Sequence, residues 1–266
     1  MAHDFDVLTG TALALADVAG TVIRPYFRAP IGSDDKSDAS PVTVADRTAE
    51  RVMWAVLVER HPEHGILGEE FGLENEGAGY RWTLDPIDGT RAFITGRPTF
   101  GTLIALTYDG EPVLGVIDQP VTGERWLGVK GRPTVFRPGF GSAAGWQPAA
   151  TRRCSALAGA DLSCTSVEML EDAPRDVWGK LKASVKRVSW GGDCYAYGLL
   201  ALGQIDVIAE CAMKVWDWAA LVPVVEGAGG RMTDWNGDAL RAGGDGTVLA
   251  VGDAARLNDA VACLRG

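Results

Sequence analysis

The sequence predicts an α/β protein of two layered units, α+β in its first half and alternating α/β in its second, on three observations. Residues 5–27 and the segment after Thr43 carry apolar side chains at helical spacing. Strand-like segments then follow one another from residue 100 to residue 129, which is typical of an antiparallel sheet. Beyond residue 148, strand-like and helical segments alternate.

A boundary between the two units is expected in the stretch 131–148, which is rich in Gly, Pro and Ala. We therefore divide the chain into an N-terminal α+β subdomain over residues 1–140 and a C-terminal α/β subdomain over residues 141–266.

The first unit begins with two helices. Pro25 ends or bends the first one. Thr43 stands three residues before Asp46, which resembles a helix N-cap signature and opens the second helix. The Asp109-Gly110 pair between apolar runs predicts a hairpin turn. Strands are expected at residues 65–67, 80–84, 100–108, 113–119 and 125–129.

The second unit alternates between strands and helices, and Gly227 and its neighbouring glycines stop the helix that precedes them. Strands are expected near Leu157 and at residues 186–189, 205–209 and 248–251. Helices are expected at residues 174–185, 193–202 and 216–226, with a last one beginning near Ala254.

Composition narrows the range of functions. The chain has 266 residues, 47% of them hydrophobic, and a formal net charge of −10. An acidic surface argues against duplex nucleic acid as a partner, because neutralising its phosphates requires basic side chains. An acidic protein that handles phosphate must create its positive field locally, and a bound divalent cation is one way to do so.

The number and positions of cysteines and histidines argue against further classes of protein and of catalytic site. The five cysteines form no C-x-x-C pair and are odd in number, which favours buried thiols in a reducing compartment. The three histidines all lie in the first quarter of the chain, which argues against a histidine-rich zinc site or a Ser-His-Asp triad. We find no stretch approaching the ~18 apolar residues that span a membrane and no signal-peptide pattern, so we expect a cytoplasmic protein.

A carboxylate-rich motif carries the chemistry. A strand delivers Asp85, Pro86 fixes the backbone, and Asp88 can fold back beside Asp85 with the Ile87 carbonyl between them. These are hard oxygen ligands suited to Mg²⁺, and carboxylates packed so closely repel one another without a cation. An ordinary Asp-rich turn with Asp88 as a helix N-cap is the alternative.

Gly89 and Thr90 follow directly and open a short predicted helix at residues 91–94. The backbone N–H groups of a helix start bind phosphate. Metal ligands beside an anion site are what metal-assisted attack on a phosphate ester requires. Neither Ser nor Cys stands beside a base as a nucleophile, so we expect direct attack by water.

Four motifs, in order along the chain, resemble those of the inositol monophosphatase family. They are Lys36, Gly68-Glu69-Glu70, the run from Trp82 to Thr90, and Trp216-Asp217-Trp218-Ala219-Ala220 followed by Glu226-Gly227-Ala228-Gly229-Gly230. The resemblance covers essentially the whole chain. It implies an αβαβα sandwich whose N-terminal subdomain carries the metal site and whose C-terminal subdomain completes the substrate pocket.

The resemblance also implies roles for individual residues. Glu69, Asp85 and the Ile87 carbonyl would hold a first Mg²⁺, and Asp85, Asp88 and Asp217 a second, with two or three ions per site. Glu69 and Thr90 would orient and deprotonate the attacking water, so Glu69, Thr90 and Asp88 count as catalytic. A homodimer acting on a small-molecule phosphate ester, without nucleic acid or membrane, is the expected assembly.

Further stretches are similar to the histidinol-phosphate phosphatase branch of the family. They are residues 88–106, 117–120, 124–128 and 191–197. Gly192-Asp193-Cys194 stands where inositol enzymes tend to carry Gly-Thr-Ala, whereas Arg91-Ala92 departs from the frequent Lys-Ser of the branch. The implied reaction is hydrolysis of L-histidinol phosphate to L-histidinol and phosphate, a step of histidine biosynthesis. The alternatives are an inositol-1-monophosphatase, a broad-specificity sugar or nucleotide monophosphatase, and a catalytically silent regulatory protein.

Histidinol phosphate carries an ammonium and an imidazole, so its pocket should offer carboxylates. Asp193 and Glu210 are the candidates, with a helix N-cap and an exposed acid as the respective alternatives. Arg187 either contacts substrate from a neighbouring subunit or is a surface residue. The predicted substrate-binding set is Ile87, Asp88, Gly89, Thr90, Asp193, Glu210, Asp217 and Arg187.

Overall fold

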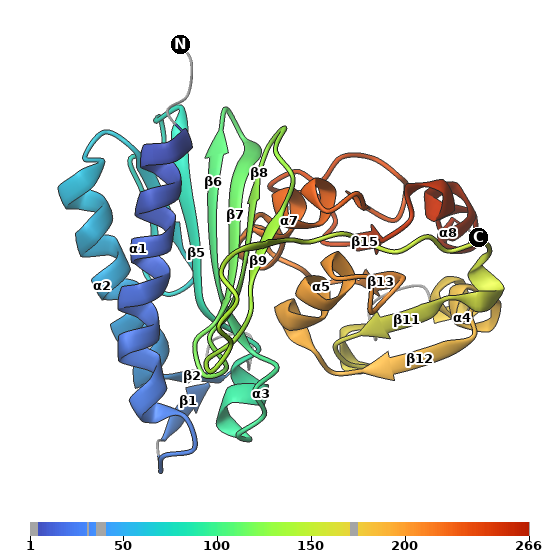
Figure 1. The fold of residues 1–266 in the computed structure, drawn as a ribbon, viewed down its shortest axis with the longest axis horizontal. Helices are drawn as coiled ribbons and strands as arrows, with labels where there is room; N and C mark the ends of the chain where they lie inside the picture. The colour runs from blue at the N-terminus through green and yellow to red at the C-terminus, as the bar shows by residue number, and fades with distance from the viewer. Residues whose placement is uncertain (1–4, 31, 36–40, 171–174, 266) are drawn as a thin grey trace.

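The computed structural model describes residues 5–30, 32–35, 41–170 and 175–265. Lys36 lies outside these residues. Within them the chain forms two large sheets and a small one with helices between and outside them (Figure 1). The predicted α/β class is confirmed.

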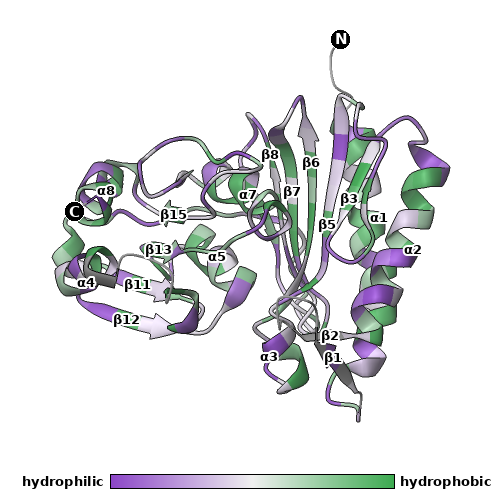
Figure 2. Cartoon of the chain, turned by 180° about the vertical axis from the view of Figure 1, so that it is seen from behind, coloured by the Kyte–Doolittle hydropathy of each residue, from purple (hydrophilic) through white to green (hydrophobic). Residues whose placement is uncertain are grey.

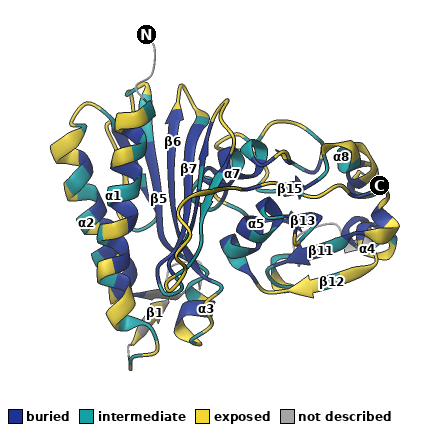
Figure 3. Ribbon diagram, viewed as in Figure 1, coloured by how far each residue is buried: buried dark blue, intermediate teal, exposed yellow. Residues whose placement is uncertain are grey.

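Two helices cover the outer face of the first large sheet. α1 (Phe5–Ile23) continues into a 3₁₀ turn at Arg24–Tyr26, and α2 (Val44–Arg60) lies beside it (Figure 1). Their apolar residues form one buried cluster with Trp82, Leu84 and Leu106 of the sheet. Figure 3 shows both helices buried toward the sheet and exposed on their outer sides. The predicted capping box of Thr43 and Asp46 is present at the start of α2.

The first sheet has the order β10-β9-β8-β7-β6-β5-β3-β4. All its neighbouring pairs are antiparallel except β3 and β5. Hydrophobic residues line β6 and β7 (Figure 2). Its strands are β3 (Gly65–Gly68), β4 (Gly72–Glu74), β5 (Tyr80–Asp88), β6 (Gly101–Tyr108), β7 (Glu111–Gln119), β8 (Glu124–Val129), β9 (Val135–Arg137) and β10 (Gln147–Pro148). A separate ribbon pairs β1 (Ser33–Asp35) with β2 (Pro41–Thr43), and α3 (Thr90–Ile94) follows β5.

The second sheet has the order β12-β11-β13-β15-β14 and mixes parallel and antiparallel pairs. Its strands are β11 (Asp161–Cys164), β12 (Arg187–Trp190), β13 (Val207–Glu210), β14 (Arg231–Thr233) and β15 (Val248–Val251). The helices of this half are α4 (Arg175–Ser184), α5 (Asp193–Ala201), α6 (Val215–Trp218), α7 (Leu221–Gly227) and α8 (Leu257–Leu264). Short 3₁₀ turns lie at Leu157–Gly159, Glu168–Leu170 and Ala254–Arg256.

Two further buried clusters complete a five-layer stack. One joins the inner face of the first sheet, through Ile117 and Trp126, to α5 and α7 and to Ile208 of the second sheet. The other joins the opposite face of the second sheet to α4 and α8. The layers are therefore helices, sheet, helices, sheet and helices, as the resemblance implied.

Some predicted elements differ from the structure. The strand expected near Leu157 is a 3₁₀ turn, and the strand itself begins at Asp161. The single helix expected at residues 216–226 is split into α6 and α7. Pro223 lacks the N–H that would continue the hydrogen-bond ladder across the break. The short strands β4, β9, β10 and β14 have two or three residues each and were not predicted.

The subdomain boundary at residue 140 stays a prediction. Strands β9 and β10, within the Gly- and Pro-rich stretch, extend the first sheet. α7 of the second half packs against the first sheet, where Thr134 Oγ1 donates to the Val224 carbonyl at 2.7 Å.

The expectation about membrane-spanning stretches needs correction. The helical segment Phe5–Tyr26 is long and apolar enough to cross a membrane by length and composition, with a mean hydropathy of 1.4. Its residues Leu15, Ala19 and Ile23 are fully buried against the rest of the protein. This is the burial pattern of a helix that packs one apolar face against a protein core.

Candidate active site

A bulge at the end of β5 shapes the centre of the site. The register against β6 shifts between Asp85, which pairs with Leu103, and Asp88, which pairs with Gly101. An extra residue in one strand re-aims the side chains on either side of it. The Ile87 amide donates to Asp85 Oδ1 at 3.0 Å. The strand thus runs through the motif to Asp88 rather than ending at Asp85.

Asp217 completes a carboxylate triad. It lies in α6, and the Lys214 amide donates to its Oδ2 at 2.6 Å. One carboxylate oxygen from each of Asp85, Asp88 and Asp217 lies within 4.8 Å of the others. The structure therefore brings together aspartates from β5 and from a helix about 130 residues further on.

Glu69 lies against the same triad. It follows β3, and its amide donates to the Leu84 carbonyl at 3.2 Å, next to Asp85. Burial raises the pKa of Asp85 well above its ordinary value, and the charges of Glu69, Asp88 and Asp217 add to the effect. Burial also raises the pKa of Asp217 to about 7, again with a contribution from Glu69.

The donor set fits a hard divalent cation. Among the described residues, no lysine or arginine forms an ion pair with Asp85, Asp88 or Asp217. Closely packed carboxylates without a counter-charge are costly, and oxygen-only ligands are those that Mg²⁺ prefers. The triad and Glu69 could therefore hold Mg²⁺.

Thr90 connects this centre to a carboxylate that the sequence interpretation treated only as a helix cap. Its hydroxyl lies 3.1 Å from the Ile87 carbonyl and 3.4 Å from Asp46 Oδ1. The other oxygen of Asp46 accepts the Thr43 amide at 2.9 Å and the Thr43 hydroxyl at 2.5 Å. Burial raises the pKa of Asp46 to about 6. The capping-box pattern of Thr43 and Asp46 is visible in the sequence, but it does not show that the second carboxylate oxygen of Asp46 faces Thr90.

Gly89 is required by its conformation and its neighbour. It has φ of 87°, and a Cβ there would lie 2.6 Å from Cγ of Asp193. Only glycine satisfies both conditions without displacing the Asp193 carboxyl group. The predicted phosphate-binding turn and the predicted specificity residue are therefore in direct contact.

Asp193 is not the N-cap of α5, because Gly192 occupies that position and Asp193 has φ of 44°. Burial and then the charge of Glu210 raise the pKa of Asp193 to about 7, whereas Arg91 and Arg97 lower it. A hydrogen bond from the backbone of Gly192 to its carboxylate also lowers this pKa.

Glu210 is not an exposed acid. It ends β13 and is 2% exposed. Its two oxygens accept the Thr165 amide at 2.6 Å and the Tyr197 hydroxyl at 2.8 Å. Burial raises its pKa, and these two donors oppose the rise.

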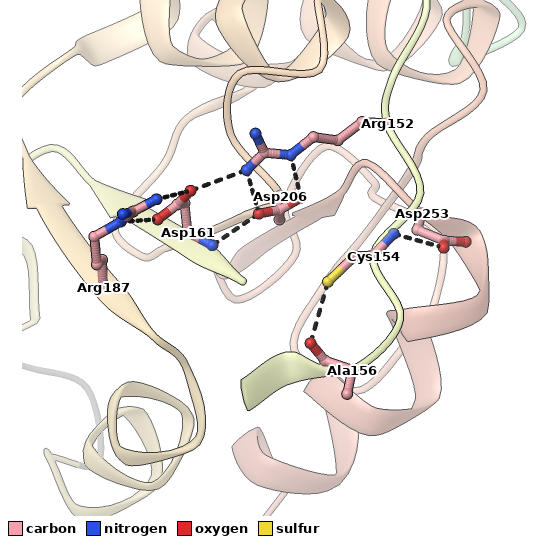
Figure 4. Close-up of polar contacts among 7 residues, drawn as sticks. All are labelled: Arg152, Cys154, Ala156, Asp161, Arg187, Asp206 and Asp253. Carbon is pink, nitrogen blue, oxygen red and sulfur yellow. Dashed lines mark hydrogen bonds and ion pairs between the residues drawn. The ribbon is translucent and has the colours of Figure 1, made fainter. Parts of the chain in front are cut away.

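Arg187 lies apart from the carboxylate cluster in this chain. It is on the edge strand β12, and its guanidinium donates to Asp161 at 2.5 and 2.9 Å (Figure 4). Arg152 bridges the same Asp161 to Asp206. This network joins β12, β11 and the segment before β13. A contact of Arg187 with substrate from a second subunit stays a prediction.

The five cysteines are all free thiols, four of them buried, as expected. One of them bears on the site, since the Cys194 amide donates to Asp88 Oδ2 at 2.6 Å. This contact ties the start of α5 to the end of β5.

We expect the metal-free protein to lose stability as pH rises from about 4 to about 7. The pKa of Asp217 and Asp193 is raised to about 7 from an ordinary 3.8, so the folded state binds protons that the unfolded state releases in this window. His61 and His64, whose pKa values are lowered, act in the opposite direction but are outnumbered by the buried acids.

Thermal unfolding in EDTA and in Mg²⁺, from pH 5 to pH 8, measures this effect. The melting temperature in EDTA should fall with pH, and the stabilisation by Mg²⁺ should grow because metal binding requires deprotonated ligands. A melting temperature in EDTA that stays constant or rises would contradict the arrangement.

Comparison with known proteins shows which family shares this sequence. The profile of the inositol monophosphatase family matches residues 4–264. The chain is 46% identical over 236 residues to the bifunctional phosphatase IMPL2, chloroplastic, of Arabidopsis thaliana, covering 88% of this chain and 66% of that protein. It is 40% identical to a histidinol-phosphatase of Mycobacterium tuberculosis, covering 92% of each chain. It is 32% identical to the Nus factor SuhB of Pseudomonas aeruginosa, covering 85% of this chain and 84% of that protein.

A solved structure gives the same picture. The chain superposes on an inositol monophosphatase from Zymomonas mobilis with a TM-score of 0.88 and 46% identity, covering 100% of both chains.

Proposed function

This chain belongs to the inositol monophosphatase family and is a phosphatase of that family, and from this premise we propose that it is a Mg²⁺-dependent hydrolase of L-histidinol phosphate. The products are L-histidinol and inorganic phosphate. The histidinol-phosphatases of Mycobacterium tuberculosis and Chlorobaculum parvum, at 40% and 36% identity, support this substrate. Action as a homodimer in the cytoplasm, without nucleic acid or membrane, is part of the same proposal.

Two acids beside the phosphate turn, the buried Glu210 and the half-buried Asp193, carry the choice of substrate. Asp193 contacts Gly89, and Glu210 is close enough to raise the pKa of Asp193. An ester whose leaving group carries an ammonium and an imidazole would supply the cationic partner that this side of the pocket favours. An uncharged polyol such as inositol would add no cation to the charges of Arg91 and Arg97 that already act on Asp193.

The residues around the triad have complementary tasks in hydrolysis. Glu69, Asp85, Asp88 and Asp217 would hold Mg²⁺, which when bound lowers the pKa of water and neutralises charge on the phosphate. Thr90 would orient the attacking water. Its hydroxyl contacts Asp46, whose carboxylate can take up the proton that Thr90 relays. The backbone at Gly89 and Thr90 would hold the phosphate oxygens.

A regulatory role without catalysis is the alternative function, and the similarity to the Nus factor SuhB supports it. Loss of catalysis is difficult to reconcile with a complete set of Glu69, Asp85, Asp88, Thr90 and Asp217. A protein retained only for regulation has no need to keep mutually repelling carboxylates.

Phosphate release with Mg²⁺ from histidinol phosphate and from inositol 1-phosphate tests the substrate. We expect kcat/KM to favour histidinol phosphate by about 10²-fold, since charged hydrogen bonds contribute about 1.5–3 kcal/mol each. Asp193→Asn should reduce this preference by about tenfold while inositol 1-phosphate hydrolysis changes little. A preference of the unaltered enzyme for inositol 1-phosphate would exclude the histidinol assignment and leave the phosphatase assignment standing.

A further inference from the structure

A second buried carboxylate of α2, Glu50, lies directly beneath the loop that carries Glu69. Glu50 is fully buried. Its Oε2 accepts the Glu70 amide and its Oε1 accepts the Phe71 amide, both at 2.9 Å. These are the two amides that immediately follow Glu69. Burial raises the pKa of Glu50 to about 7, the two amides oppose the rise, and the charges of Glu70 and Glu69 add to it. In its ionised form Glu50 makes charge-assisted bonds to the two amides, which are stronger than neutral ones.

Gly68, the residue before Glu69, lies directly against the Glu50 carboxylate. A Cβ added to Gly68 would lie 1.8 Å from Glu50 Oε1, so the end of β3 rests on the carboxylate itself. On the other side, the Glu69 amide donates to the Leu84 carbonyl of β5. The backbone around Glu69 is therefore held from α2 and from β5 at once.

This anchoring opposes an electrostatic force. Before a cation binds, the charges of Asp85 and Asp217 repel Glu69, since both aspartates feel its charge. A loop held only by solvent-exposed contacts would move Glu69 outward. We propose that Glu50 is a positioning residue that holds Glu69 against the aspartate triad and so prepares the site for its cation. The proposal rests on the Mg²⁺ dependence proposed above.

Other side-chain contacts also join α2 to the hairpin of β3 and β4, so loss of the Glu50 hydrogen bonds need not unfold this hairpin. Arg51 lies over the Phe71 ring, with its guanidinium carbon 5.7 Å from the ring centroid. Trp54 Nε1 donates to Glu74 Oε2 at 3.0 Å. A change at Glu50 should therefore act on the position of Glu69 more than on the fold.

Glu50→Gln tests the role, because the amide keeps the shape but directs an NH₂ group at one of the two amides. We expect the Mg²⁺ dissociation constant, measured by isothermal titration calorimetry without substrate, to rise by about tenfold, as for other residues that orient metal ligands. The melting temperature in EDTA should change little, and kcat at saturating Mg²⁺ should stay within about threefold of the unaltered enzyme.

Two further variants make the result specific. Glu74→Ala removes the neighbouring bond from Trp54 on the same hairpin and should leave Mg²⁺ affinity unchanged. Gly68→Ala displaces the Glu50 carboxylate without altering it and should weaken Mg²⁺ binding like Glu50→Gln; it decides the matter if Glu50→Gln fails to fold. Normal Mg²⁺ affinity in both Glu50→Gln and Gly68→Ala would overturn the role of Glu50. Failure of the unaltered protein to bind Mg²⁺ would instead overturn the proposed function.

Discussion

Replacing Asp88 by asparagine is expected to lower kcat by about 10³-fold or more, equivalent to about 4 kcal/mol of transition-state stabilisation. Asp88 contributes one of three carboxylates whose oxygens lie within 4.8 Å of one another. Asparagine keeps the shape but removes the charge that a divalent cation needs there. Its carbonyl oxygen can still accept the Cys194 amide that Asp88 Oδ2 now accepts at 2.6 Å, so the local structure should persist.

The same variant should not be less stable than the unaltered protein when metal is absent. Burial raises the pKa of Asp88 well above its ordinary value, and Asp193 and Asp217 add to this, so removing its charge relieves repulsion. Melting in EDTA should therefore be preserved, whereas the stabilisation by Mg²⁺ should shrink. Asp238→Asn, on an exposed turn of the second half, is the matched control and should keep full activity. Turnover of Asp88→Asn within tenfold of the control would refute the metal-ligand role.

The parts of the site that could be predicted are those in which chemistry is concentrated in a short stretch of sequence. Asp85, Asp88, Gly89 and Thr90 lie within six residues, and a strand followed by a turn must place them near one another. Asp217 was predictable only through the family resemblance, because no local pattern shows that α6 packs onto the end of β5. The bulge in β5 was not predicted, because the predicted strand ends at Asp85 and the observed one continues to Asp88.

Asp46 and Glu50 show why other functional residues escape sequence analysis. They occupy a helix whose apolar spacing predicts only which face is buried. Both are buried with that face. From sequence alone, a carboxylate in a helix is expected to be exposed unless its hydrogen-bond partners are known. Those partners, Thr90 and the amides of Glu70 and Phe71, come from segments 20 to 44 residues away. Tertiary contacts of this kind leave no periodic signal.

Replacing Arg125 by methionine is expected to destabilise the protein by about 3–5 kcal/mol, the typical effect of breaking a buried ion pair. Arg125 is 3% exposed and Asp118 is 2% exposed. Arg125 Nε donates to Asp118 Oδ1 at 2.6 Å, and Nη2 donates to Asp17 Oδ1 at 2.9 Å. The guanidinium thus joins β7 and β8 to α1. Methionine fills similar volume but leaves the Asp118 carboxylate buried without a counter-charge, and unfolding by urea in EDTA measures the loss.

Two further variants separate the destabilisation caused by the unpaired Asp118 charge from that caused by lost packing. Arg132→Met breaks the exposed pair with Asp6 and should cost less than about 1 kcal/mol, because solvent screens such pairs. The double variant Arg125→Met with Asp118→Leu removes both buried charges and should recover most of the lost stability. If the double variant is as unstable as Arg125→Met alone, the guanidinium acts through its bonds to α1 rather than by neutralising Asp118. Full stability of Arg125→Met would mean that Asp118 is protonated in the native state, because only the neutral acid tolerates burial without its partner.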